Sequence, residues 1–147
     1  MAVLNGKEAP VSDCIFCQIV QGRANCHRVY EDDEVLAFLD IFPVSPGHVL
    51  VIPKEHAVDI FDLEETSAQA VARVARKVAY AVEETLRPDG LMVAQLNREA
   101  AGQTVFHYHM HLIPRAAGDS MAMHTRVPGD PGEMAGIASR LVVALEH

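Results

Sequence analysis

Three histidines alternate with apolar residues in the segment FHYHMHLIP, which covers residues 106–114. Successive side chains of a β-strand point to opposite faces, so a strand over residues 105–113 would put His107, His109 and His111 on one face. A neutral imidazole can attack phosphorus or bind a metal near neutral pH. The spacing therefore indicates either a nucleophilic site or a catalytic zinc site. A polar, half-exposed strand face is the third interpretation that the spacing leaves open.

Two cysteines form a second group with possible chemistry. Cys14 and Cys17 have the Cys-x-x-Cys spacing of zinc sites, and two later histidines would complete a closed tetrahedral set. Two buried thiols without a metal are the alternative. The chain contains three cysteines, which favours a reducing compartment over a disulfide framework, and Cys26 has no predicted partner. No βαβ pattern surrounds the pair, which argues against a thioredoxin-like redox role.

The composition limits the partners of such a site. The chain has 147 residues, 50% of them hydrophobic, which is enough for one core and predicts a single domain. Its formal net charge of −8 would repel a nucleic acid polymer, although a small anion could still bind in a local pocket. No apolar run has the length of a membrane span, and the first ten residues lack the pattern of a secretory signal. We expect a cytoplasmic protein with neither a membrane nor a nucleic acid partner.

The elements that position the histidines are predicted to form an α+β fold with a mostly antiparallel sheet of about five strands. A loose tail over residues 1–12 precedes a short helix over residues 14–20. The third strand is apolar on both faces, as a central strand would be, and Pro53 closes it. The expected strands are residues 29–30, 35–39, 48–52, 91–96 and 105–113.

Two longer helices complete the expected fold. The first begins near Thr66, because Thr66 and Gln69 have capping-box spacing and apolar residues repeat at helical intervals as far as Val82. The sequence Pro-Asp-Gly at residues 88–90 ends this helix. A loop over residues 115–132, rich in Gly, Pro and Met, leads to a C-terminal helix over residues 133–146.

Beyond the individual patterns, the chain resembles the histidine triad (HIT) family. The stretch HYHMHLIP matches the family signature, in which histidines alternate with apolar residues. The stretches CIFCQIVQG, VYEDDEVLAFLDIFPVSPGHVLVIPKEH and LNREAAGQTVFHYHMHLIPR also look like family members, in the family's order. They cover most of residues 14–115, and the CIFC start is similar to the bacterial Hint-like branch. The resemblance implies a single HIT domain over residues 1–147 with the HIT-like fold.

The resemblance also implies a function. It indicates a nucleotide hydrolase or transferase that cleaves at the α-phosphate of purine nucleoside phosphoramidates or adenylylated compounds, through a covalent nucleotidyl-His109 intermediate and without a metal in the chemical step. The alternatives are a dinucleoside polyphosphate (Ap4A-type) hydrolase and a nucleotide-binding protein with vestigial activity. Thr104 would help to protonate a leaving amine. The implied catalytic residues are His109, His111, His107, His48 and Thr104.

The same likeness assigns the binding residues. Asp40 would pair with the ribose hydroxyls, beside a base pocket formed by Ile15, Phe16, Phe38, Ile41 and Leu50. The expected phosphate donors are Asn97, Gly102 through its amide, Gln103 and Thr104, together with His109 and His111. In bacterial relatives with CIFC, a structural zinc is bound at the positions of Cys14, Cys17, His56 and His107. Family members are usually homodimers, so a homodimer is expected, with a purine nucleotide as substrate.

Overall fold

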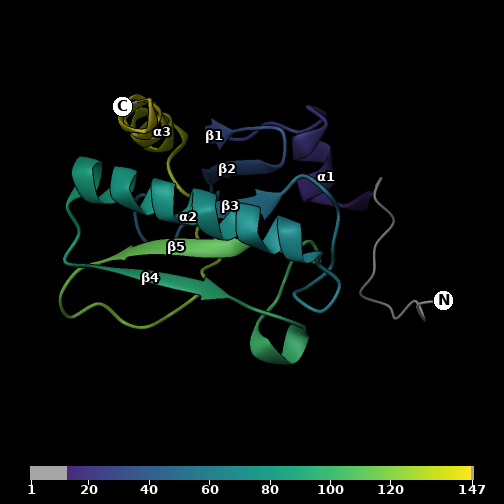
Figure 1. Cartoon of the computed structure of the whole chain (residues 1–147). Helices are drawn as coiled ribbons and strands as arrows, with labels where there is room; N and C mark the ends of the chain where they lie inside the picture. The colour runs from purple at the N-terminus through teal and green to yellow at the C-terminus, as the bar shows by residue number, and fades with distance from the viewer. Residues whose placement is uncertain (1–12, 147) are drawn as a thin grey trace.

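The computed structural model describes residues 13–146, and this part of the chain folds into one antiparallel sheet with helices on both faces (Figure 1). Hydrogen-bonded neighbours follow the order β1-β2-β3-β5-β4, and every pair is antiparallel. This confirms the predicted α+β architecture with an antiparallel sheet of five strands, while the expected tail over residues 1–12 lies outside the described residues. The strands are β1 (Arg28–Glu31), β2 (Val35–Leu39), β3 (Val49–Pro53), β4 (Gly90–Gln95) and β5 (Met110–Arg115). The helices are α1 (Ile15–Val20), α2 (Glu65–Leu86), the 3-10 helix η2 (Glu99–Ala101) and α3 (Pro131–Leu145).

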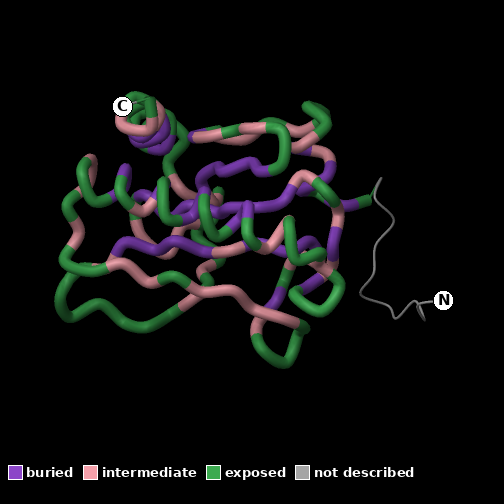
Figure 2. The backbone as a smooth tube through the Cα atoms, viewed as in Figure 1, coloured by how far each residue is buried: buried purple, intermediate pink, exposed green. Residues whose placement is uncertain are grey.

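The sheet separates two apolar clusters, because alternate residues of its central strands point to opposite faces. Val49 and Val51 of β3 join the large cluster formed with α2 and α3. Leu50 and Ile52 join a smaller cluster with α1 on the other face. All five residues of β3 are buried, as predicted for a central strand, and Figure 2 shows the buried runs concentrated in the middle of the sheet. The face that carries α1 is the face that holds the site described below.

Helix α2 begins within one residue of the predicted start, but its N-terminal cap differs from the prediction. The helix begins at Glu65, and its N-cap residue Glu64 makes no side-chain capping bond, so the expected capping box at Thr66 and Gln69 is wrong. Packing supplies the stability instead, since a stripe of buried residues faces the sheet. This stripe consists of Ala70, Val71, Val74, Ala75, Val78, Ala81 and Val82. The helix ends as predicted, where Arg87 adopts a left-handed conformation with φ of 47° directly before a proline.

The strand that carries the triad is shorter than predicted. Strand β5 starts at Met110, whereas the sequence pattern favours a strand from residue 105. The last ladder pair between the two strands is Val51 with Met110, although β3 itself continues to Pro53. Upstream of that pair, the N–H of Tyr108 donates to the carbonyl of Ala57 at 2.7 Å. The extended alternation nevertheless continues, because Tyr108 and Met110 pack on the α2 side.

The C-terminal segment follows the prediction closely. Residues 116–130 contain no helix or strand, and α3 then begins at Pro131, two residues earlier than expected. The Asp130 side chain caps this helix by accepting from the N–H of Glu133 at 2.8 Å. Within residues 13–146, no helix has both the length and the apolar character needed to cross a membrane.

Candidate functional site

A cavity of about 710 Å³ opens on the sheet face opposite α2. Its walls come from α1, from β2 and the loop after it, from the triad segment, and from the segment between β5 and α3. The lining residues are Ile15, Phe16, Ile19, Asn25, Cys26, Phe38, Leu39, Asp40, Ile41, Phe42, Leu50, Thr104, Val105, His109, His111, His124, Thr125 and Arg126. The cavity therefore joins a largely apolar wall to a group of imidazoles, as expected of a small-molecule site.

His109 lines this cavity, and within residues 13–146 one of its ring nitrogens has no hydrogen-bond partner. Its Nδ1 lies 2.7 Å from the carbonyl oxygen of His107, and a carbonyl can only accept, so Nδ1 carries the proton. The Nε2 atom consequently has an available lone pair. Burial lowers the pKa of His109 below its ordinary value, which keeps the ring neutral at pH 7. These are the properties of an imidazole nucleophile.

His48 and His111 form a chain of hydrogen bonds that determines their tautomers. The main-chain N–H of Val44 donates to Nδ1 of His48 at 3.1 Å, so His48 carries its proton on Nε2. That N–H donates to Nδ1 of His111 at 2.9 Å, which leaves the His111 proton on Nε2. Within the described residues, Nε2 of His111 is buried and has no hydrogen-bond partner. A buried unpaired donor is costly, and an anion in the cavity would satisfy it.

The tautomers of these two rings can be measured directly. Burial lowers the pKa of His48 to about 4 and that of His111 to about 3, so both rings should remain neutral at pH 5.5, with the proton on Nε2. Long-range ¹H–¹⁵N imidazole spectra report this state. A doubly protonated ring at either position would contradict the hydrogen-bond chain.

Unfolding provides the control for this measurement. In urea-unfolded protein both rings should titrate near pH 6.5. Because the unfolded chain then binds more protons than the folded chain below that pH, these two histidines reduce the free energy of unfolding as pH falls from about 6.5 toward 4.

Asp40 lies in the cavity beside His48. One carboxylate oxygen accepts from the N–H of Phe42 at 2.9 Å, and the other lies 3.6 Å from Nε2 of His48. Burial raises the pKa of Asp40. Asp40, His48 and His111 are close enough to resemble a metal site, but both ring nitrogens of His48 already form hydrogen bonds. We therefore interpret this group as a hydrogen-bonding cluster.

The apolar residues expected around a base all line the cavity. Three of them, Phe16, Phe38 and Leu50, are buried. The ring of Phe16 contacts the ring of His109 edge-on, with 5.2 Å between the ring centroids. Ile15 and Ile41 are 45% and 55% exposed, which leaves two large apolar side chains at the opening. An aromatic heterocycle would bury both.

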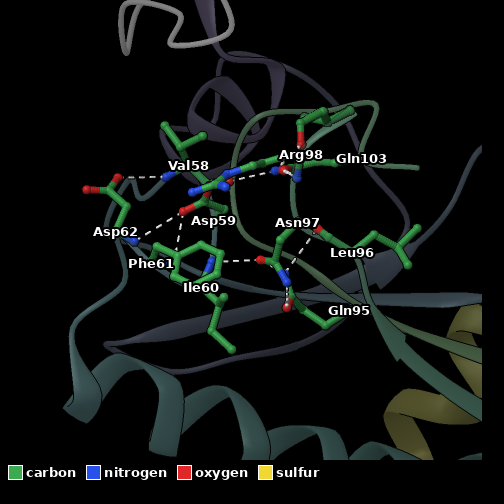
Figure 3. Close-up of polar contacts among 11 residues, drawn as sticks. Val58, Asp59, Ile60, Phe61, Asp62, Gln95, Leu96, Asn97, Arg98 and Gln103 are labelled. Carbon is green, nitrogen blue, oxygen red and sulfur yellow. Dashed lines mark hydrogen bonds and ion pairs between the residues drawn. The ribbon is translucent and has the colours of Figure 1, made fainter. Parts of the chain in front are cut away.

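Three of the expected phosphate donors lie outside the cavity wall and have other partners. Figure 3 shows the partners of Asn97 and Gln103. The Asn97 side chain accepts from the N–H of Ile60 at 2.8 Å. The Gln103 side chain accepts from the N–H of Arg98 at 2.6 Å and donates to the carbonyl of Val58 at 2.6 Å. The amide of Gly102 donates to the carbonyl of Glu99 at 2.9 Å. In this arrangement Asn97, Gly102 and Gln103 hold the loop together, while Thr104 reaches the cavity.

Gln103 should therefore matter for stability. Its side chain is 2% exposed, and a second donor bond reaches the carbonyl of Val105 at 3.1 Å. Gln103→Leu would leave the Arg98 N–H and the Val58 carbonyl without these partners, so we expect a loss of about 2–4 kcal/mol in the free energy of unfolding. Urea unfolding measures this, with the exposed Gln69→Leu as control. A loss below about 0.5 kcal/mol would show that water replaces the bonds.

Three further ligand-type side chains gather around His107 of the triad. The ligand atoms of Cys14, Cys17, His56 and His107 all lie within 4.8 Å of one another. Nδ1 of His107 is 3.4 Å from the Cys14 sulfur, and Nδ1 of His56 is 3.2 Å from the Cys17 sulfur. His107 donates from Nε2 to the carbonyl of Pro53 at 2.8 Å, which leaves Nδ1 unprotonated and able to bind a metal.

This donor set fits zinc. Two thiolates and two imidazoles form a tetrahedral set that favours Zn²⁺ and leaves no open position. His107 does not line the cavity, so its ring belongs to the metal group, and its carbonyl orients His109. A zinc ion here would tie α1 to the triad segment.

Comparison with known proteins identifies the family. The HIT domain profile matches residues 21–118 of the chain. This chain belongs to the HIT family. It is 40% identical to the protein hit of Bacillus subtilis over 137 residues, which is 90% of this chain and 94% of that protein. It is also 41% identical over 113 residues to the adenylylsulfatase HINT3 of Arabidopsis thaliana, covering 75% of this chain and 56% of that one.

Solved structures of HIT proteins have the same fold. A Hit-like protein from Bartonella henselae superposes with a TM-score of 0.86 at 34% identity, covering 93% of this chain and 99% of that chain. A zinc-bound histidine triad family protein from Mycobacterium smegmatis superposes with a TM-score of 0.82 at 39% identity, covering 93% and 96%. The second structure agrees with the zinc-type donor set of this chain.

Some lining residues were absent from the sequence prediction. Val105 directly follows the predicted Thr104, whereas Ile19 and Asn25 are not adjacent in sequence to any predicted residue. His124, Thr125 and Arg126 come from the irregular segment after β5, where no periodicity indicates which side chains face inward.

Proposed function

We propose that this HIT-family protein is a nucleotide hydrolase or transferase that cleaves at the α-phosphate of purine nucleoside phosphoramidates or adenylylated compounds. The observation that carries the proposal is the unprotonated Nε2 of His109, which lines the cavity next to the N–H of His111, a donor without a partner among the residues that the structure describes. A nucleophile and an anion donor are thus adjacent, as two-step displacement at phosphorus requires. The adenylylsulfatase name of the Arabidopsis relative supports an adenylylated substrate.

The reaction would proceed in two displacements. Nε2 of His109 forms a bond to the α-phosphorus while the bond to the leaving group breaks, and the leaving group departs with that electron pair. The imidazole gains positive charge in this step, which its Nδ1–H bond to the His107 carbonyl stabilises. Water then attacks the same phosphorus and loses a proton to solvent, and the bond to His109 breaks with its electron pair returning to Nε2. A nucleoside monophosphate and neutral His109 result.

Other cavity residues would position the substrate. His111 donates to a non-bridging phosphoryl oxygen, and Thr104 supplies a hydroxyl proton to a leaving amine. Asp40 accepts from the ribose hydroxyls, which offsets the burial of its carboxylate. The base lies against the apolar wall next to Phe16.

The proposal is tested by product analysis. Purified protein is incubated with adenosine phosphoramidate, guanosine phosphoramidate and diadenosine tetraphosphate, and released mononucleotide is quantified by chromatography. The proposal expects rapid AMP or GMP release from the phosphoramidates. Preference for the tetraphosphate would favour the polyphosphate hydrolase instead, and binding without turnover would indicate a nucleotide-binding protein.

The structure also supports a homodimer as part of this proposal. Strand β4 is at the edge of the sheet, Val93 on it is 53% exposed, and Tyr80 of α2 is 62% exposed. Pairing between copies would cover an open strand edge, which soluble proteins rarely leave free. Sedimentation as a monomer at micromolar concentration would refute this assembly.

The metal group has a separate role in the proposal. Cys14, Cys17, His56 and His107 would hold a zinc ion that serves the fold, because all four positions of a tetrahedral ion would be occupied by protein ligands. His109 is not among these ligands, so its attacking nitrogen remains available for phosphorus.

A further inference from the structure

The turn between β2 and β3 joins the two strands that carry His48 and His111. In this turn the N–H of Val44 donates to Nδ1 of His48 at 3.1 Å, and the carbonyl of Ser45 accepts from the N–H of His48 at 3.1 Å. The Ser45 hydroxyl donates to the carbonyl of Pro114 at 2.5 Å. Pro114 belongs to β5 and follows His111 by three residues. Ser45 therefore connects the turn that holds His48 to the strand that holds His111.

Packing places the same turn directly against its neighbours. Gly47 has a φ of 88°, a left-handed conformation that favours glycine. A Cβ at this position would collide with the side chain of Leu86 at the end of α2, and it would lie 3.3 Å from Cγ of Pro114. The backbone of the turn is thus in close contact with α2 and β5, and the Ser45 hydroxyl adds a directional bond across the contact with β5.

The position of the turn selects one of two arrangements of protons. While the Val44 N–H donates to Nδ1 of His48, the Nε2–H of His48 donates to Nδ1 of His111. The His111 proton is then on Nε2, the nitrogen that has no partner within residues 13–146. Without the Val44 bond, His48 can carry its proton on Nδ1 and accept at Nε2 from Nδ1–H of His111. His111 would then present a lone pair to a phosphoryl oxygen, and two acceptors repel each other.

We propose that Ser45 is a positioning residue for the reaction: its bond to the Pro114 carbonyl keeps the Val44 N–H on His48 and thereby keeps His111 in the tautomer that donates to the phosphoryl group. This inference rests on the proposed function. Ser45 does not line the cavity, so it acts through His48 and His111 and touches no substrate. Because only the donating tautomer is competent, the rate follows the fraction of molecules in which the His111 proton is on Nε2.

Ser45→Ala tests the proposal, with the imidazole ¹⁵N signals of His111 measured beside activity. In the wild-type protein these signals should show the Nε2–H tautomer alone. In Ser45→Ala they should move toward the average of both tautomers. The kcat/KM for AMP release from adenosine phosphoramidate should fall about 5- to 10-fold, in proportion to the remaining Nε2–H fraction. AMP affinity by calorimetry should fall less, about 2- to 5-fold, because the base and ribose contacts are unchanged.

Three further variants provide the rescue, the graded comparison and the control. Ser45→Thr keeps the hydroxyl and should restore the His111 signals and the rate to within about 2-fold of wild type. Ser45→Cys has a weaker donor and should give intermediate values, which keeps the test available should Ser45→Ala not fold. Ser120→Ala is the matched control and should change neither property. Ser120 lines the same surface hollow as Ser45, and its side chain forms no hydrogen bond within the described part of the chain.

A merely structural role for Ser45 has a different signature. A lower Tm or a lower rate in Ser45→Ala with unchanged His111 signals would overturn the proposal, and so would wild-type signals and rate. The spectra also separate this outcome from failure of the proposed function. If the wild-type protein cleaves no nucleotide but Ser45→Ala shifts the His111 tautomer and weakens AMP binding, the hydrolase proposal fails and the positioning role of Ser45 stands. If the wild-type protein releases AMP and Ser45→Ala keeps the wild-type tautomer, the positioning role fails and the hydrolase stands.

Discussion

His109→Asn should reduce the rate of AMP release from adenosine phosphoramidate by about 10³-fold or more, which is the loss typical when a covalent nucleophile is removed. Asparagine has a side chain of similar reach, and its amide N–H can still donate to the carbonyl that holds Nδ1 of His109 at 2.7 Å. It has no nitrogen lone pair that can bond to phosphorus. The cavity should therefore keep its shape and lose its nucleophile. Initial rates by chromatography, together with AMP affinity by calorimetry, measure both properties.

A matched histidine variant and a trapping experiment sharpen this prediction. His27→Asn makes the same change outside the cavity and should leave the rate within about 2-fold of wild type. Alkaline quenching during turnover should trap the nucleotidyl group on a peptide that contains His109, because a phosphorus–nitrogen bond to imidazole is labile to acid. Turnover by His109→Asn at the wild-type rate, or trapping of the nucleotide on another peptide, would disprove the assignment of the nucleophile.

The fold could be predicted because its main signals are local. The apolar stretch that becomes β3 is buried on both faces, as its composition indicates, and the stop at residues 88–90 ends α2 within two residues of the prediction. The errors arose where tertiary contacts override local pattern. The Thr66 capping box was not formed, because α2 begins at Glu65 and is stabilised by packing. The triad strand is shorter than predicted because the chain before Met110 leaves the β3 ladder, and the N–H of Tyr108 donates to the carbonyl of Ala57 instead.

Two observations on the sequence predicted part of the site: the alternation of the histidines and the resemblance to the HIT family. The histidines share one face as expected, and the resemblance named the apolar wall. The tautomers depend on backbone groups that the pattern of side chains does not reveal. The N–H of Val44, four residues before it, determines the tautomer of His48, and the carbonyl of Pro53, 54 residues away, determines that of His107. The role of Gln103 was hidden for the same reason, since its partner Val58 lies 45 residues away. His124 could not be predicted, because the segment between β5 and α3 has no regular secondary structure from which the direction of its side chain could be inferred.

Replacement of a zinc ligand should have the largest effect on stability. Cys14→Ser or Cys17→Ser removes one of four ligand atoms that lie within 4.8 Å of one another, so we expect each variant to lose stoichiometric zinc. A closed structural site contributes its binding free energy to folding. We expect a loss on the order of 5 kcal/mol and a Tm lower by on the order of 10–20 °C. Elemental analysis and thermal unfolding measure the two effects.

The third cysteine provides the matched control. Cys26 lies outside the four-ligand group, so Cys26→Ser should retain zinc and unfold within about 2 °C of wild type. Wild-type protein that contains no zinc after metal-replete expression, or Cys14→Ser with an unchanged Tm, would refute the structural metal site.

The same site predicts how the metal and the chemistry are connected. His107 offers Nδ1 to the metal group, while its carbonyl receives the proton-bearing nitrogen of His109. Loss of zinc should therefore loosen the carbonyl that orients the nucleophile, without removing any group that touches the substrate. Chelated protein that is still folded below its lowered Tm should keep a measurable kcat, and added zinc should restore stability and rate together. A complete loss of kcat in folded, metal-free protein, with AMP affinity intact, would instead show that the ion takes part in the reaction.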